Sequence, residues 1–139
     1  MSRVTRYHLQ VMFGDCDPAG IVFFPNFSKW MDAASHHYFQ ACGVPPWREL
    51  YEETRLIGTP LLEIHTKFYV SATYGQSLTI DTQITSWGRK TFEQLHQVYR
   101  GDTLLCEGTE TRIFVVRPNP QADEIKSVVV PQWIKEKCQ

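Results

Sequence analysis

Residues 13–35 read FGDCDPAGIVFFPNFSKWMDAAS, and this stretch joins a turn to the longest amphipathic segment of the chain. Residues 14–20 hold two glycines, two aspartates and a proline, a composition that is typical of turns. Beyond them, apolar side chains recur at spacings of three and four, as on an amphipathic helix. They are Phe27, Trp30, Met31, Ala34, Tyr38 and Ala41. The pattern predicts a helix of about sixteen residues over 26–42, with Asn26 as N-cap and Gly43 at its stop.

Outside this helix the sequence has the period-two alternation of β-strands. Residues 7–13 alternate apolar and polar side chains, which predicts a half-buried strand that stops at Gly14. Alternation returns over 61–117, and turn-forming clusters divide that region into four strands with antiparallel neighbours. The clusters are 74–76, 88–90 and 100–102. Since only the long helix can cover such a sheet, we expect a single α+β domain over 1–139, with a five-stranded antiparallel sheet around a central helix.

Two shorter helices are predicted beside prolines. Residues 47–51 follow Pro46, which presets the backbone for a helix start. A last helix is expected to start near Pro131, with Trp133 and Ile134 as its anchors.

The composition excludes several classes of protein. Of the 139 residues, 42% are hydrophobic and 21% are charged, as in globular domains large enough for one core. A net charge of −1 argues against a dedicated nucleic-acid binder, which must neutralise many phosphates. No apolar run reaches the roughly 18 residues of a membrane span, and the first residues do not resemble a signal peptide. The four cysteines form no C-x-x-C pair, so a reduced, cytoplasmic protein without membrane partners is expected.

Asp17 is the first candidate for chemistry, because it stands in the turn that leads into the long helix. An aspartate in a turn commonly accepts hydrogen bonds from its own backbone, and on sequence alone this structural role has priority. The first N–H groups of a helix, however, are free donors, and the helix start favours negative charge. A carboxylate beside them could attack a carbonyl carbon while the N–H groups hold the oxyanion.

The run 13–35, extended by GVPPWRE at 43–49 and GTP at 58–60, resembles the 4-hydroxybenzoyl-CoA thioesterase family of hotdog-fold proteins. The resemblance covers most of the chain, and its D-x-D-x-x-G-I-V-x-[FY]-x-N block is specific. It implies a hotdog fold, in which the sheet wraps the helix, and hydrolysis of an aromatic acyl-CoA such as 4-hydroxybenzoyl-CoA. It also implies a homo-oligomer, a dimer or a tetramer, in which two helices pair back to back with active sites between subunits.

The same resemblance implies roles for individual residues. Asp17 takes the place of the catalytic carboxylate, as nucleophile or general base, and the backbone N–H of Phe24 that of the donor to the thioester carbonyl. Thr59 matches a substrate-binding position near the carboxylate, although a Thr that starts a strand is the plain alternative. Asp32 matches the acceptor for a ring hydroxyl of the acyl group; without the resemblance it would be a solvated helix residue. Arg89 and Lys90 match the basic residues that hold the phosphates of CoA, although a two-residue basic turn alone carries little weight.

No metal or redox cofactor is expected, and CoA enters as part of the substrate. The five histidines show no ligand spacing, so solvated or interface positions are expected for them. Three alternatives remain open at this point. The chain could hydrolyse aliphatic acyl-CoA with Asp32 as a surface charge, or bind acyl-CoA without catalysis. A hotdog hydratase is disfavoured, because the turn contains no histidine.

Overall fold

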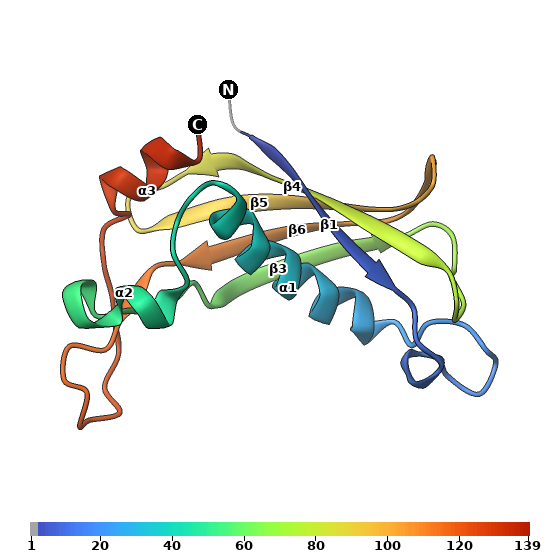
Figure 1. The fold of residues 1–139 in the computed structure, drawn as a ribbon, viewed down its shortest axis with the longest axis horizontal. Helices are drawn as coiled ribbons and strands as arrows, with labels where there is room; N and C mark the ends of the chain where they lie inside the picture. Colours follow the sequence, from blue (N-terminus) through green and yellow to red (C-terminus); the bar gives the residue numbers. More distant parts are fainter. Residues whose placement is uncertain (1–2) are drawn as a thin grey trace.

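The computed structural model describes residues 3–139, and its main sheet has five antiparallel strands in the order β1-β4-β5-β6-β3. The long helix α1, Pro25–Ala41, lies across one face of this sheet (Figure 1). The strands are β1 (Val4–Gln10), β3 (Leu61–Phe68), β4 (Ser77–Trp87), β5 (Thr91–Arg100) and β6 (Thr103–Ile113). The predicted α+β architecture, a five-stranded sheet around one helix, is therefore confirmed.

Shorter elements lie at the two ends of the sheet. Helices follow Pro46 and Pro131, as the sequence predicts, and three short strands form a second sheet in the order β2-β7-β8. The helices are η1 (Phe13–Asp15), α2 (Trp47–Thr54) and α3 (Gln132–Lys137); the strands are β2 (Leu56–Gly58), β7 (Val115–Val116) and β8 (Lys126–Ser127). Ile134 is buried in the core, but Trp133 is exposed, so only one of the two expected anchors of α3 is confirmed.

The buried face of α1 is rotated relative to the predicted stripe. Its buried side chains are Phe27, Met31, Ala34, Ser35, Tyr38 and Phe39. Trp30 is half-buried and packs against the core, whereas Ala41 is exposed, so the prediction is wrong for Ala41. At 100° per residue, including Ser35 and Phe39 shifts the centre of the buried arc away from Trp30 and toward Asp32. Asp32 therefore lies at the margin of the buried face rather than opposite to it.

The core consists of two apolar clusters, one around each half of α1. A layer of buried polar side chains separates the clusters, as the order along each strand shows. On β5, Gln94 and His96 lie between Phe92 of one cluster and Val98 of the other. On β6, Gly108 allows α1 to approach closely, because a Cβ there would lie 2.5 Å from the Sδ atom of the fully buried Met31.

Two predictions about the strands are wrong. The turn at 74–76 does not join neighbours, because β3 pairs with β6, while β4 lies between β1 and β5. The connection from β3 runs past the 14–24 loop, where the Val22 N–H donates to the Ala72 carbonyl at 2.9 Å. The first strand ends at Gln10 rather than Gly14, and Phe13, which lies in η1, is exposed.

The edge strand β3 is exposed on both faces, with Thr66 alone half-buried. The alternation predicted a half-buried strand, but α1 packs mainly on β1, β4 and β5 and leaves this edge uncovered. The exposed side chains include large apolar ones: Leu61, Leu62, Ile64 and Phe68. An apolar edge strand of this kind is a surface on which another chain can pack.

Candidate active site

Asp17 lies in a tight loop whose two sides are joined by backbone hydrogen bonds. Its N–H donates to the Ile21 carbonyl at 2.9 Å, and Cys16 and Val22 form an isolated bridge. The Oδ1 atom of Asp17 accepts hydrogen bonds from the N–H groups of Ala19 at 2.9 Å and Ile21 at 3.4 Å. Within residues 3–139, Oδ2 accepts none. The turn therefore fixes the carboxylate through one oxygen and leaves the other free for a reacting group.

The start of α1 is attached to this loop through the carbonyl of Asp15. That carbonyl accepts hydrogen bonds from the N–H of Phe23 at 2.9 Å and from the side-chain amide of Asn26 at 2.7 Å. The helix begins at Pro25 with Phe24 as N-cap, so the prediction of Asn26 as N-cap is wrong. The Asn26 side chain instead serves to join the loop to the helix.

The sequence predicts free backbone N–H donors at the start of the helix, and within residues 3–139 this is confirmed for Phe24. The N–H groups of Asn26 and Phe27 donate to the carbonyls of Phe23 and Phe24, and Pro25 has no N–H. The N–H of Phe24 donates to no acceptor within residues 3–139. It is therefore an available donor at the end of the helix that carries positive partial charge, where a carbonyl oxygen or oxyanion would be stabilised.

Around Asp17 the surface forms an open cleft of about 460 Å³. The rings of Phe13 and Tyr74, in edge-to-face contact with centroids 5.2 Å apart, form part of its lining. The wall is thus partly aromatic, while the carboxylate supplies its charge.

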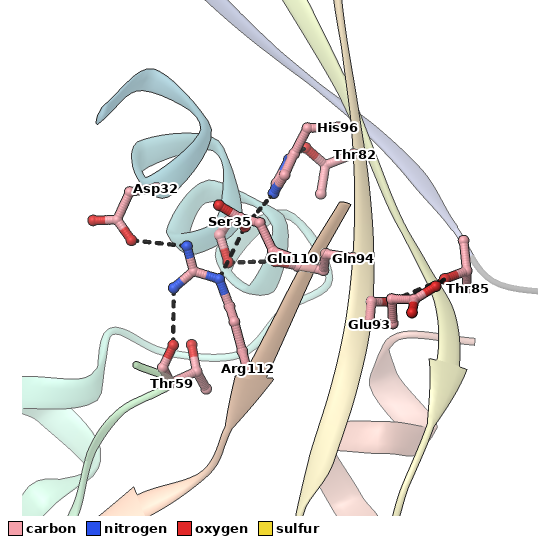
Figure 2. A network of polar contacts seen from close by, with 10 residues as sticks. All are labelled: Asp32, Ser35, Thr59, Thr82, Thr85, Glu93, Gln94, His96, Glu110 and Arg112. Carbon is pink, nitrogen blue, oxygen red and sulfur yellow. Dashed lines mark hydrogen bonds and ion pairs between the residues drawn. The ribbon is translucent and has the colours of Figure 1, made fainter. Parts of the chain in front are cut away.

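Asp32 and Thr59 lie together in a second cleft, of about 450 Å³. Arg112, which is almost completely buried, joins them: its Nη2 donates to Asp32 Oδ1 at 2.9 Å and its Nη1 to the Thr59 carbonyl at 2.8 Å (Figure 2). Trp47 and Val115 contribute apolar walls. The substrate-binding pair that the resemblance implies is therefore brought together by a residue that the sequence analysis did not single out.

Behind Arg112, the polar layer continues across three strands (Figure 2). Arg112 Nε donates to Glu110 Oε1 at 3.0 Å, and the same oxygen lies 2.6 Å from His96 Nε2. His96 Nδ1 lies 2.7 Å from the Thr82 hydroxyl, on the strand directly opposite. A carboxylate only accepts, so His96 Nε2 carries a hydrogen and donates it to Glu110.

Glu110 is ionised in this setting. Burial alone would raise the pKa of its carboxyl, but the hydrogen bond from His96 and the positive charge of Arg112 outweigh burial, so the pKa lies below its ordinary value of 4.5. The buried positive charge of Arg112 therefore has a buried negative partner as well as the exposed Asp32.

Within one copy of the chain, the two clefts are separate. They share no lining residue, and from Phe24 to Asp32 the helix rises by about 12 Å. The structure thus places Asp17 and Phe24 at one end of α1 and brings Asp32 and Thr59 together elsewhere.

Arg89 and Lys90 lie in the β4–β5 turn, at the end of the sheet near α3 and far from the 14–24 loop (Figure 1). Arg89 is exposed, whereas Lys90 Nζ donates to the Ser127 hydroxyl at 3.1 Å. The Lys90 carbonyl accepts from the N–H of Phe114, next to Val115 of the second cleft. The basic turn therefore belongs to the side of the molecule that carries Asp32, not Asp17.

Sequence reasoning missed Arg112, Glu110 and His96. For His96, the expectation of a solvated or interface position is wrong, because its side chain is completely buried. A signal was available: inward positions of β5 and β6, spaced by two residues, carry polar side chains where alternation calls for apolar ones. Buried polar groups at such positions require partners, and that requirement points to a network.

Of the four cysteines, Cys16 lines the Asp17 cleft, and Cys42, Cys106 and Cys138 are buried. All four cysteines are free thiols; burial raises the pKa of Cys106 to about 12, whereas a hydrogen bond with Cys138 contributes most to lowering the pKa of Cys42 to about 7. Cys42 is buried at the far end of α1 from Asp17. Among residues 3–139, no three His, Cys, Asp or Glu side chains are grouped as metal ligands. In the same part of the chain, none of the helices has the length and apolarity that crossing a membrane requires.

Comparison of the sequence with known protein families gives one clear assignment. The family model of the thioesterase-like superfamily matches residues 11–138. The chain belongs to the thioesterase-like superfamily. It is 41% identical over 143 residues to 4-hydroxybenzoyl-CoA thioesterase of Pseudomonas sp. (strain CBS-3), with 99% of each chain covered. The recognition made from the sequence and the hotdog fold that it implied are confirmed.

Solved structures agree with this thioesterase-like assignment. The structure of the D17N mutant of 4-hydroxybenzoyl-CoA thioesterase, complexed with 4-hydroxybenzoyl-CoA, has a TM-score of 0.93 at 38% identity and covers 99% of this chain and 100% of its own. A gentisyl-coenzyme A thioesterase has a TM-score of 0.84 at 29% identity, with 97% of this chain and 100% of its own covered.

The lowered pKa of Glu110 predicts a specific acid sensitivity. A group whose pKa is lower in the folded state stabilises the fold above its unfolded pKa, and this contribution is lost as pH falls through the folded value. We expect the free energy of unfolding, measured with urea between pH 7 and pH 3, to decrease below the ordinary Glu value of 4.5 more steeply in the wild type than in Glu110→Gln. Parallel pH profiles would contradict the ionised state of Glu110.

Proposed function

We propose that this protein is an acyl-CoA thioesterase, which hydrolyses an aromatic acyl-CoA such as 4-hydroxybenzoyl-CoA to the free acid and CoA. The observation that carries the proposal is the Asp17 carboxylate, held by its own turn at the start of α1 with Oδ2 free. The 41% identity to 4-hydroxybenzoyl-CoA thioesterase supports it. So does the structure of the related D17N mutant complexed with 4-hydroxybenzoyl-CoA.

The chemistry of the proposed site follows from two groups. The N–H of Phe24 donates to the thioester carbonyl oxygen and stabilises the negative charge that develops there. Asp17 either attacks the carbonyl carbon, releasing CoA as the C–S bond breaks and leaving an anhydride for water to cleave, or removes a proton from the attacking water. Both routes end in a carboxylic acid and free CoA, and neither draws on a metal or redox cofactor.

An aromatic acyl group suits the second cleft. Trp47, Ile57 and Val115 supply apolar walls, and Asp32 supplies an acceptor for a ring hydroxyl. Thr59, with its carbonyl fixed by Arg112, lines the same cleft. Two relatives are named 4-hydroxybenzoyl-CoA thioesterase and gentisyl-coenzyme A thioesterase. Both acyl groups are hydroxylated rings, which supports an aromatic acyl group over an aliphatic chain. We also propose a cytoplasmic setting, supported by the four free thiols and testable by cell fractionation.

We further propose that the active site is completed by a second copy of the chain. The separation of the Asp17 and Asp32 clefts within one copy supports this. The exposed apolar edge of β3 supports it as well, since Phe68 also contacts the ring of Phe24 at the helix start, with centroids 6.2 Å apart. We expect a dimer or tetramer by sedimentation at micromolar concentration; a stable monomer with full activity would contradict this proposal.

Arg89 is expected to contact a phosphate of CoA at the protein surface. Since such a contact is equally strong in the ground and transition states, replacing Arg89 and Lys90 by Ala should raise KM by about tenfold or more and leave kcat nearly unchanged. The effect should shrink at high salt. Arg6→Ala is the matched control, because Arg6 is exposed and pairs with Asp81 on β4. An unchanged KM in the double variant would exclude this phosphate site.

Replacing Asp17 tests the catalytic role directly. Asn retains an oxygen for the N–H groups of Ala19 and Ile21, so the turn is preserved while the charge and the nucleophile are lost. We expect Asp17→Asn to bind the thioester but to lower kcat by about 10²-fold or more, measured as release of free thiol.

The matched control is Asp15→Asn in the same turn. Within residues 3–139 the Asp15 side chain accepts only from the N–H of Met12, so this variant should turn over at near wild-type rate. Rapid hydrolysis by Asp17→Asn would reject the assignment. Tight binding without turnover in that variant, beside an active wild type, would also exclude the alternative of a protein that only binds acyl-CoA.

A further inference from the structure

We propose that Arg112 is a positioning residue for acyl-group specificity: it fixes the carboxylate of Asp32 so that one oxygen accepts a hydrogen bond from a ring hydroxyl. This inference rests on the proposed function and deepens it, since it assigns recognition of the acyl group to a buried network. The network links Thr82, His96, Glu110, Arg112 and Asp32 across the core (Figure 2).

The guanidinium of Arg112 is held on three sides. Nε donates to Glu110 Oε1 at 3.0 Å, Nη1 to the Thr59 carbonyl at 2.8 Å, and Nη2 to Asp32 Oδ1 at 2.9 Å. The planar fork of an arginine makes such a set of directed bonds, which a lysine ammonium cannot reproduce. Only 4% of the Arg112 side chain is exposed, against 66% of that of Asp32. A fixed buried donor thus holds one oxygen of a carboxylate that otherwise faces solvent.

The free oxygen of Asp32 defines what it can recognise. Within residues 3–139 no group donates to Oδ2, and Asp32 lines the cleft whose walls include Trp47 and Ile57. An ionised carboxylate only accepts hydrogen bonds, so the complementary ligand is an apolar ring that carries a donor. A hydroxyl on the ring fits this requirement, whereas an unsubstituted ring leaves Oδ2 without a partner.

Stability does not account for the network. Burial of an ion pair is costly, and apolar side chains of similar volume often stabilise a fold as well or better. Here Glu110 and Arg112 lie between two apolar clusters that could have been continuous. What the charged pair provides is a fixed position for Asp32 at the cleft, because Glu110 is itself held by His96, and His96 by Thr82.

The test compares 4-hydroxybenzoyl-CoA with benzoyl-CoA, which lacks the hydroxyl. Arg112→Lys keeps the charge but loses the planar fork of the guanidinium. We therefore expect kcat/KM for 4-hydroxybenzoyl-CoA to fall by about tenfold relative to kcat/KM for benzoyl-CoA. Asp32→Ala should lower the same ratio, and adding Arg112→Lys to Asp32→Ala should change it no further, because the two residues act on one contact. Arg6→Lys, in an exposed ion pair, should leave the ratio unchanged.

A second variant keeps the test decisive if Arg112→Lys does not fold. The double variant Arg112→Met with Glu110→Gln removes both buried charges together, and Gln still accepts from His96, so no uncompensated charge is left. It should fold and lose the preference for the hydroxylated substrate.

The ratio of dissociation constants for the two thioesters, measured in the Asp17→Asn background, should shift in the same way without any turnover. A wild-type ratio in a folded Arg112 variant, or equal losses on both substrates, would overturn the proposal. If the wild type hydrolysed neither thioester, the proposed function would fail, while the binding ratio would still decide the role of Arg112.

Discussion

The buried charge of Arg112 is the constraint around which much of this structure is arranged. A guanidinium in a protein core needs a negative partner and several acceptors, and these come here from three separate segments. β6 supplies Glu110, Thr59 directly after β2 supplies its carbonyl, and α1 supplies Asp32. β5 contributes through His96, which holds Glu110. The position of the Asp32 carboxylate and of the Thr59 carbonyl at the second cleft therefore depends on the same set of hydrogen bonds.

The proposed chemistry is divided between two regions with different physical character. Asp17 lies in a loop, where backbone N–H groups donate to its carboxylate. Phe24 lies at the start of α1, where its N–H stabilises an oxyanion in the proposed reaction. Asp32 lies at the mouth of a cleft backed by a buried network that fixes its orientation. Both aspartates have one oxygen held by the protein, and among the described residues the other oxygen accepts no hydrogen bond. In the proposed function, this division separates catalysis from recognition of the acyl group.

The sequence predicted those features that depend on local patterns. Periodicity and turn-forming residues predict helix α1, the turn around Asp17 and the four strands after residue 60, because these elements depend on residues that are close in the sequence. The position of β3 at the edge could not be predicted in this way, since pairing with β6 rather than β4 depends on contacts between distant residues. The Asn26 side chain was misassigned for the same reason: its acceptor is Asp15, eleven residues away. Arg112 was not identified from the sequence, because alternation indicates which face of a strand is buried but not which distant residues pair with a buried charge.

The central claim is that Asp17 of one copy and Asp32 of another copy serve a single acyl-CoA. It is tested most directly by a heterodimer of an Asp17→Asn chain and an Asp32→Ala chain, purified through two different affinity tags and assayed with 4-hydroxybenzoyl-CoA. If each site is shared between copies, one of the two sites of the heterodimer contains both intact aspartates and the other contains neither. The heterodimer should then retain about half of the wild-type activity. If each copy carried a complete site, every site would lack one aspartate, and activity no higher than the mean of the two mutant homodimers would contradict the account.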